Sequence, residues 1–128
     1  MAERALRILV VDDASLVRLY YRRILEGAGY EVDEAFNGLE ALEKLLENPP
    51  DLLIVDVNMP QMDGITFLAA LREQSLPSSA IPALVTSTEA GAQDRVAARL
   101  AGANSYLVKP LSDTVLTEHV AMMCGRRA

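Results

Sequence analysis

Two short apolar runs that end abruptly in acidic residues constrain this chain most strongly. The run at 8–11 (Ile-Leu-Val-Val) is followed by Asp12 and Asp13, and the run at 52–55 (Leu-Leu-Ile-Val) is followed by Asp56. A short, continuous, β-rich run is typical of a strand that is buried on both faces of a parallel sheet. Ligand sites of such sheets lie at the carboxyl ends of the strands. Neighbouring strands would therefore bring the three carboxylates to one place.

Three carboxylates at one place repel one another strongly. Two unit charges about 4 Å apart cost roughly 4 kcal/mol at an effective dielectric constant of about 20. A fold tolerates such a cluster only with a bound cation or with strongly shifted protonation. Three hard oxygen donors with an open side suit Mg²⁺, which keeps waters and often bridges to a phosphate. The sequence therefore predicts a Mg²⁺-dependent phosphoryl site formed by Asp12, Asp13 and Asp56.

Length and composition indicate a single domain over residues 1–128, with a core at about 6–124. The hydrophobic content of 51% argues against disorder, and a net charge of −6 argues against a nucleic-acid-binding surface. No apolar run approaches the ~18 residues of a membrane span, and the first apolar run is too short for a signal peptide. One cysteine, Cys124, excludes an internal disulfide and fits a reducing cytoplasm. Arg126-Arg127 is expected to be a solvated tail.

Strand and helix signals alternate along the whole chain. Strands are expected at 8–11, 30–35, 52–55, 83–86 and 105–109, and helical patterns follow each of them. Five such units predict a parallel sheet with right-handed crossovers and helices on both faces. The usual solution is the flavodoxin-like three-layer α/β sandwich with strand order 2-1-3-4-5, in which strands 1 and 3 are neighbours. Thr86 and Lys109 would then end strands 4 and 5 at the same rim as the acids.

Local signals mark where helices begin. Ser15 is expected near the N-cap of the first helix. Asn37, with Glu40 three residues later, resembles a capping box. Asp63-Gly64 is expected to act through turn chemistry, with Gly64 supplying a positive φ before the third helix.

Four motifs at the expected strand ends resemble the receiver domain of two-component response regulators, of the single-domain chemotaxis type. The motifs are Val10-Val11-Asp12-Asp13, the nine residues from Asp56 to Gly64, Val85-Thr86-Ser87, and Tyr106-Leu107-Val108-Lys109-Pro110. Each motif alone is weak, but the four stand at strand ends in the family's order. The resemblance covers nearly the whole chain.

The resemblance implies a role for each residue of the expected site. Asp56 would be the phospho-acceptor. Mg²⁺ would be held by Asp12, Asp13, Asp56 and the backbone carbonyl of Asn58. The phosphoryl group would be contacted by Thr86 and Lys109. These residue types suit phosphoryl transfer, because a carboxylate can form an aspartyl phosphate while a cation and a hydroxyl stabilise the charge of the group being transferred.

The resemblance also implies a switch and a partner face. Thr86 and Tyr106 would form the switch, with Tyr106 changing its rotamer on phosphorylation. Tyr106 and His119 would lie on the face shared by the fourth helix, fifth strand and fifth helix. The Lys109-Pro110 peptide would be cis, as in the family. Ser87 departs from the family, which usually has Ala or Gly there, and its hydroxyl is expected to alter the phosphate's surroundings slightly.

The function that the resemblance implies is signalling rather than enzymatic turnover. A histidine kinase or a histidine phosphotransfer protein would supply the phosphoryl group, and the chain would catalyse only its own phosphorylation and dephosphorylation. Because the chain ends soon after the last helical pattern, we expect output through a protein partner, such as the flagellar motor switch in chemotaxis. A phosphorelay intermediate or a phosphate sink is the alternative. We expect a cytoplasmic monomer without nucleic-acid or membrane partners.

Two other classes of protein use related features. A haloacid-dehalogenase-like phosphatase also has a strand-end aspartate with Mg²⁺, but it needs a second aspartate two positions later, where this chain has Asn58. A flavodoxin-type FMN-binding module would need a Ser/Thr/Gly-rich phosphate loop after the first strand. Asp12 and Asp13 stand at that place and would repel a metal-free phosphate.

Overall fold

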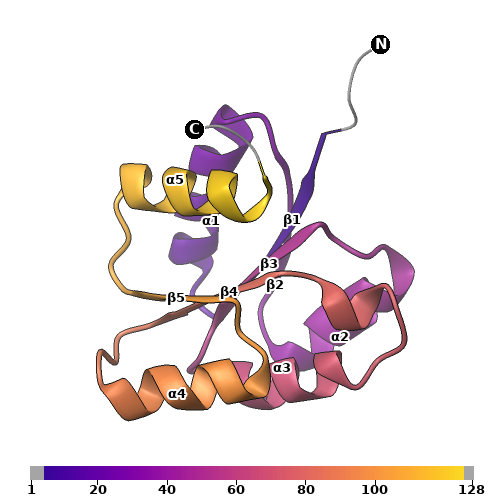
Figure 1. Cartoon of the computed structure of the whole chain (residues 1–128). Helices are drawn as coiled ribbons and strands as arrows, with labels where there is room; N and C mark the ends of the chain where they lie inside the picture. The colour runs from indigo at the N-terminus through magenta and orange to yellow at the C-terminus, as the bar shows by residue number, and fades with distance from the viewer. Residues whose placement is uncertain (1–4, 126–128) are drawn as a thin grey trace.

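The computed structural model describes residues 5–125, in which five parallel strands alternate with five α-helices (Figure 1). In chain order the elements are β1 (Arg7–Val11), α1 (Ser15–Gly27), β2 (Glu31–Ala35), α2 (Gly38–Glu47), β3 (Leu52–Asp56), α3 (Gly64–Arg72), the short 3₁₀ helix η1 (Ser78–Ala80), β4 (Ala83–Ser87), α4 (Ala92–Ala101), β5 (Ser105–Val108) and α5 (Asp113–Met123). Within this range no helix has the length and apolar character that a membrane crossing requires. The predicted tail, Arg126-Arg127, lies outside the described residues.

The strand order is β2-β1-β3-β4-β5, and every neighbouring pair is parallel. This confirms the flavodoxin-like architecture and the adjacency of strands 1 and 3 that the sequence predicts. Val11 of β1 is level with Val55 of β3, and Asp56 is level with Thr86 of β4. The residues that follow β1 and end β3 and β4 therefore share one edge of the sheet.

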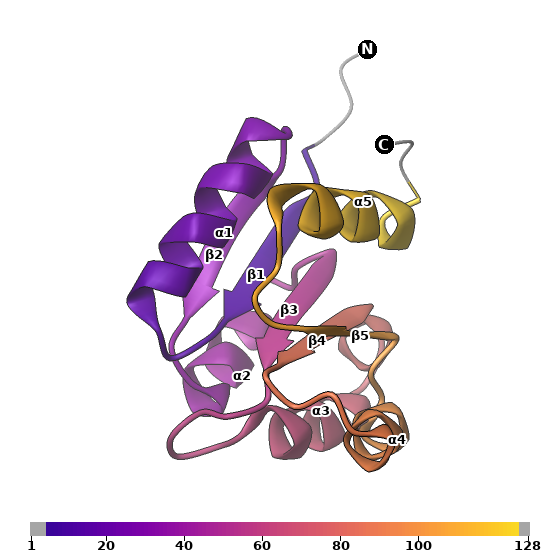
Figure 2. The ribbon, with the colours of Figure 1, turned by 90° about the vertical axis from the view of Figure 1, so that its left-hand side faces the viewer.

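Helices cover both faces of the sheet, with α1 and α5 on one side and α2, α3 and α4 on the other (Figure 2). The central strands alternate between these two layers. Residues that face α1 and α5 include Ile8, Val10, Leu52, Ile54 and Leu84. Residues that face α2, α3 and α4 include Leu9, Val11, Leu53, Val55 and Val85. The runs at 8–11 and 52–55 are continuously apolar because both faces of their strands are buried.

A side chain caps α2 at the predicted place. The Asn37 side chain accepts a hydrogen bond from the Glu40 amide at 2.8 Å, and the Glu40 carboxylate accepts one from the Phe36 amide at 2.8 Å. This pair closely follows the predicted capping box. Ser15 lies next to the N-cap, as predicted, because it is the first residue of α1; the N-cap itself is Ala14, whose side chain cannot accept a hydrogen bond. Asp12 organises this turn instead, since its Oδ1 accepts from the Ala14 amide at 2.9 Å.

Gly64 begins α3, but the reason for a glycine differs from the predicted one. The positive-φ glycines among the described residues are Gly29, Gly102 and Gly125, so Gly64 does not supply a left-handed turn. A Cβ atom on Gly64 would lie 2.3 Å from the carbonyl oxygen of Asp56. The glycine is therefore required because the start of α3 passes very close to the end of β3.

Candidate functional site

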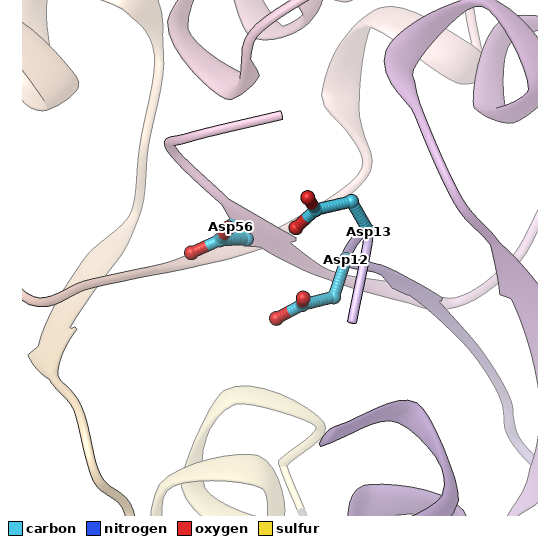
Figure 3. A group of neighbouring side chains, drawn as sticks. All are labelled: Asp12, Asp13 and Asp56. Atoms are coloured by element: carbon cyan, nitrogen blue, oxygen red, sulfur yellow. The ribbon is translucent and has the colours of Figure 1, made fainter. Parts of the chain in front are cut away.

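The three predicted aspartates meet at the carboxyl edge of the sheet (Figure 3). Asp12 follows β1 directly, Asp13 is the next residue, and Asp56 is the last residue of β3. One carboxylate oxygen from each lies within 4.8 Å of the others. Asp12 and Asp56 are only 1% and 6% exposed, whereas Asp13 is exposed. Three hard oxygen donors with one open side fit a divalent cation such as Mg²⁺.

Lys109 reaches this cluster from the residue after β5. Its Nζ lies 2.7 Å from Asp12 Oδ2 and 3.0 Å from Asp56 Oδ1. Burial alone would lower the pKa of Lys109, but the hydrogen bonds and charges of Asp12 and Asp56 raise it above its ordinary value. The Lys109-Pro110 peptide is cis, as predicted. Lys109 is thus a fixed cation that joins the ends of β1, β3 and β5.

One ammonium group does not balance three carboxylates. Burial raises the pKa of Asp56 above its usual range, the charge of Asp12 adds to this rise, and the contacts with Lys109 oppose it. The metal-free site therefore resists ionisation of Asp56, as the sequence argument about clustered acids predicts. A cation that bound beside these oxygens would remove this penalty.

Thr86 lies beside Asp56 on the neighbouring strand, and it is completely buried. Its hydroxyl has no hydrogen-bond partner among residues 5–125. A buried hydroxyl that lacks a partner costs about 1–3 kcal/mol. The Thr86 hydroxyl is therefore available to an acceptor that arrives next to Asp56.

The loop after β4 links this edge to Tyr106 of β5. The Ser87 hydroxyl accepts a hydrogen bond from the Glu89 amide at 3.0 Å, and the Tyr106 hydroxyl donates one to the Glu89 carbonyl at 2.7 Å. The guanidinium of Arg95 on α4 lies 5.0 Å from the centre of the Tyr106 ring. Ser87 thus uses its hydroxyl to hold this loop. Sequence reasoning missed Glu89, because a backbone carbonyl leaves no signal in the residue type.

The remaining predicted residues take no part in these contacts. Asn58 is exposed in the loop two residues after Asp56. His119 lies on α5, half-buried, with Nδ1 2.9 Å from the carbonyl oxygen of Val115 in its own helix. The roles of Asn58 as a carbonyl ligand and of His119 as a partner contact stay predictions.

The family model described as the response regulator receiver domain matches residues 8–121 of this chain. The chain belongs to this family. This membership favours the receiver over the phosphatase and flavin-binding alternatives, and receivers are signalling domains rather than ordinary enzymes.

Individual relatives agree with this assignment. The chain is 41% identical to the transcriptional regulatory protein PrrA of Mycobacterium tuberculosis over 121 residues, which cover 94% of this chain and 51% of PrrA. It is 42% identical to a protein-glutamate methylesterase/protein-glutamine glutaminase of Archaeoglobus fulgidus, and the match covers 95% of this chain and 35% of that protein. Among solved structures, chemotaxis protein CheY4 of Vibrio cholerae is 35% identical to this chain and superposes with a TM-score of 0.88. The match covers 94% of this chain and 99% of CheY4. This receiver spans about half the length, or less, of these two curated relatives.

Proposed function

We propose that this receiver accepts a phosphoryl group on Asp56 in a Mg²⁺-dependent reaction, from a histidine kinase or a histidine phosphotransfer protein. The observation that carries the proposal is the meeting of Asp12, Asp13, Asp56 and Lys109 at one edge of the sheet. Family membership supports it, because receivers are the phospho-accepting domains of two-component signalling. We also propose that residues 1–128 form one domain that acts as a monomer. We place it in the cytoplasm because its single cysteine fits a reducing compartment.

In the transfer, a carboxylate oxygen of Asp56 forms a bond to phosphorus, and the bond from phosphorus to the donor nitrogen breaks. Lys109 already lies 3.0 Å from Asp56 Oδ1, so its positive charge faces the place where the phosphoryl oxygens arrive. The Thr86 hydroxyl, buried beside Asp56, donates a hydrogen bond to one of these oxygens. Lys109 is held in place by Asp12 and Asp56 before the reaction, so the protein contributes positioning and electrostatic stabilisation.

Asp12, Asp13, Asp56 and the backbone carbonyl of Asn58 would hold the Mg²⁺ ion. When bound, the ion offsets the repulsion between the aspartates and the phosphoryl group and spreads the charge of the transition state. The close approach of the three carboxylates, within 4.8 Å, supports this assignment.

Mass spectrometry of the intact protein tests the proposal. Incubation with acetyl phosphate and Mg²⁺ should add one phosphoryl group to the parent and none to Asp56→Asn. Asp63→Asn is the matched control, because Asp63 is an exposed aspartate seven positions later that caps α3. It should label like the parent. Labelling of Asp56→Asn, or labelling of the parent in the presence of EDTA, would contradict the proposal.

For output, we propose that phosphorylation changes the face formed by α4, β5 and α5, and that a protein partner reads this face. Tyr106, with its hydrogen bond to Glu89 and its contact with Arg95, links the loop after β4 to this face. A hollow of about 290 Å³ lies here, lined in part by Arg95, Arg99 and Tyr106. The likeness to CheY4 supports a chemotaxis-type partner, such as the flagellar motor switch.

Amide chemical shifts measured before and after addition of beryllofluoride, a mimic of the phosphoryl group, test the output. Shifts should move across residues 86–109 and into α5. Tyr106→Ala should accept phosphate normally but lose affinity for the partner. Shifts confined to the loops after β1 and β3 would contradict the switch while leaving the phosphorylation of Asp56 intact.

A further inference from the structure

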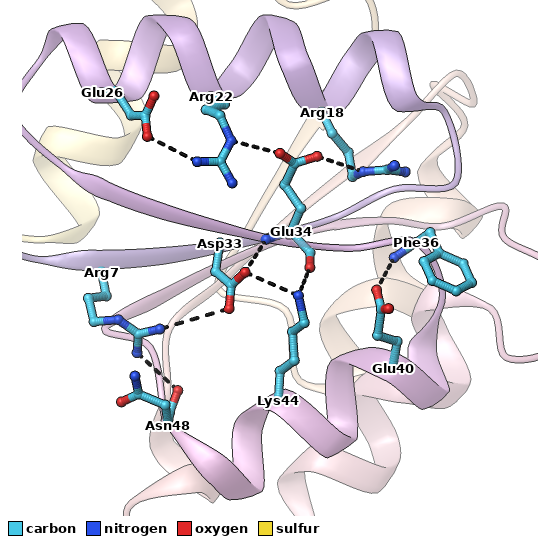
Figure 4. Close-up of polar contacts among 10 residues, drawn as sticks. All are labelled: Arg7, Arg18, Arg22, Glu26, Asp33, Glu34, Phe36, Glu40, Lys44 and Asn48. Atoms are coloured by element: carbon cyan, nitrogen blue, oxygen red, sulfur yellow. Dashed lines mark hydrogen bonds and ion pairs between the residues drawn. The ribbon is translucent and has the colours of Figure 1, made fainter.

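Arg18 of α1 contacts the backbone that carries the acidic cluster. It also pairs with Glu34 of β2 (Figure 4). Its Nη1 donates a hydrogen bond of 2.6 Å to the carbonyl oxygen of Asp12, and its Nε donates one of 2.8 Å to the Glu34 carboxylate of β2. The Arg18 side chain is only 15% exposed. Two donors of one planar guanidinium therefore hold a carboxylate and the end of β1 at the same time.

The Asp12 carbonyl is one of four anchors that fix this residue. The other three belong to the rest of Asp12. The Asp12 amide donates to the Ala35 carbonyl at 3.1 Å, Oδ1 accepts from the Ala14 amide, and Oδ2 accepts from Lys109. Among residues 5–125, only the contact from Arg18 acts on the peptide group between Asp12 and Asp13. Because a peptide group is planar, holding the carbonyl oxygen of Asp12 also sets the orientation of the Asp13 amide.

Asp13 has no such support of its own. It is exposed, and no described residue donates a hydrogen bond to its carboxylate within 5–125. Its direction therefore depends on the backbone at its N-terminal side. Loss of a group that orients a metal ligand without touching the metal typically lowers metal affinity by about 10–100-fold.

We infer that Arg18, oriented by Glu34, is a positioning residue for the cation site, because it fixes the peptide group that aims Asp13 at Asp12 and Asp56. This role rests on the Mg²⁺ binding proposed above. It goes beyond the ion pair with Glu34, because that pair alone does not reach the acidic cluster.

Arg22, one turn further along α1, is a natural control. It donates to the same Glu34 carboxylate at 2.7 Å and pairs with Glu26 at 3.0 Å, but no hydrogen bond joins it to Asp12. Burial alone would raise the pKa of Glu34, but its hydrogen bonds with Arg22 and Arg18 lower it below its ordinary value. Loss of either arginine therefore removes one positive charge and one bond to Glu34. Only loss of Arg18 frees the Asp12 carbonyl.

The sign of the effect separates positioning from simple electrostatics. Removing a positive charge near an acidic cluster should strengthen the binding of a cation by Coulomb attraction. A loss of positioning should weaken it. Arg18→Gln is therefore expected to bind Mg²⁺ roughly tenfold more weakly than the parent, at the lower end of what such orienting contacts contribute. Arg22→Gln is expected to bind it equally well or slightly better.

Isothermal titration of each protein with Mg²⁺ measures this difference, and melting temperatures in EDTA report the stability of each variant. Amide hydrogen exchange in EDTA gives a second readout, because Ala14 should exchange faster in Arg18→Gln and not in Arg22→Gln. Equal Mg²⁺ affinity in Arg18→Gln and the parent, or equal losses in both variants, would overturn the role of Arg18. A parent that bound no Mg²⁺ would overturn the proposed function as well.

Discussion

Replacing Asp56 by asparagine should make the metal-free protein more stable near neutral pH, although it removes the proposed phospho-acceptor. Asparagine keeps the shape of the side chain and removes its charge. Asp56 is 6% exposed, and its pKa is raised by burial and by the charge of Asp12. The ionised carboxyl group is therefore unfavourable in the folded protein and costs nothing comparable in the unfolded chain.

The expected gain follows from three opposing contributions. Asp12 lies within 4.8 Å, so its repulsion of Asp56 is about 3.5 kcal/mol at an effective dielectric constant of about 20. Asp13 is exposed, and water reduces its repulsion to about 1–2 kcal/mol. The attraction to Lys109, 3.0 Å away, is about 5.5 kcal/mol and nearly cancels both. The desolvation of the buried carboxylate then decides the sign, and we expect a net gain of about 1–3 kcal/mol for the variant.

A gain of this size corresponds to a melting temperature about 4–12 °C higher in a domain of this length. The pH dependence follows from the raised pKa. A carboxyl group with a raised folded pKa favours folding below its unfolded pKa, and this contribution is lost as pH rises through the folded pKa. The variant should therefore have a higher melting temperature than the parent at neutral pH. The two melting temperatures should become equal at about pH 4 and below.

Thermal unfolding followed by circular dichroism, in EDTA and across this pH range, measures the effect. Adding Mg²⁺ should narrow the difference, because the ion stabilises the folded parent by mass action and the variant has lost one ligand. Asp63→Asn is again the control and should not gain stability, since Asp63 is exposed and caps α3. The reasoning would be refuted if the variant were less stable than the parent in EDTA near neutral pH. It would also be refuted if the difference in melting temperature did not change with pH.

Three further changes test other parts of the structure. Gly64→Ala places a Cβ 2.3 Å from the Asp56 carbonyl oxygen. The free energy of unfolding in urea should therefore fall by about 1–3 kcal/mol, and phosphoryl labelling of Asp56 should slow. Normal labelling would contradict this. Arg72 donates to three backbone carbonyls, so Arg72→Met should cost about 2–4 kcal/mol in the same assay and leave labelling unchanged. Ser87→Ala should speed amide exchange at Glu89 without changing Mg²⁺ affinity, and slow exchange there would show that the hydroxyl does not hold the loop.

The sheet and the acidic cluster were predictable because their signals are local. A strand buried on both faces must be apolar at consecutive positions, and the runs at 8–11 and 52–55 meet this requirement without help from distant residues. The parallel order then follows from repeated βα units, and it places strand ends together. Once the ends are together, the residues that follow them, such as Asp12 and Asp56, form the site.

Features that depend on close approach in three dimensions were not predictable. Gly64 resembles an ordinary turn glycine in the sequence, and its conflict with the Asp56 carbonyl exists only when α3 packs against the end of β3. Ser15 marks the start of α1 correctly, but the sequence does not reveal that the Asp12 carboxylate, rather than an N-cap side chain, accepts the hydrogen bond of the Ala14 amide. The contact of Arg18 with the Asp12 carbonyl depends on the reach of a long side chain toward a backbone atom, which residue type does not reveal.

Two unfavourable features of the unmodified site lie side by side, and cation binding and phosphorylation together would relieve them. Asp56 holds a charge that burial and Asp12 disfavour, and Thr86, level with it on β4, buries a hydroxyl without a partner in the described chain. A cation beside Asp56 would offset the repulsion, and a phosphoryl group on Asp56 would accept the Thr86 hydrogen bond. The hydroxyl alone accounts for about 1–3 kcal/mol. A shift of a two-state equilibrium from 1:99 to 99:1 needs a difference in stabilisation of about 5.5 kcal/mol between the two states, so a Thr86 hydrogen bond made only in the phosphorylated state would supply part of what a switch requires.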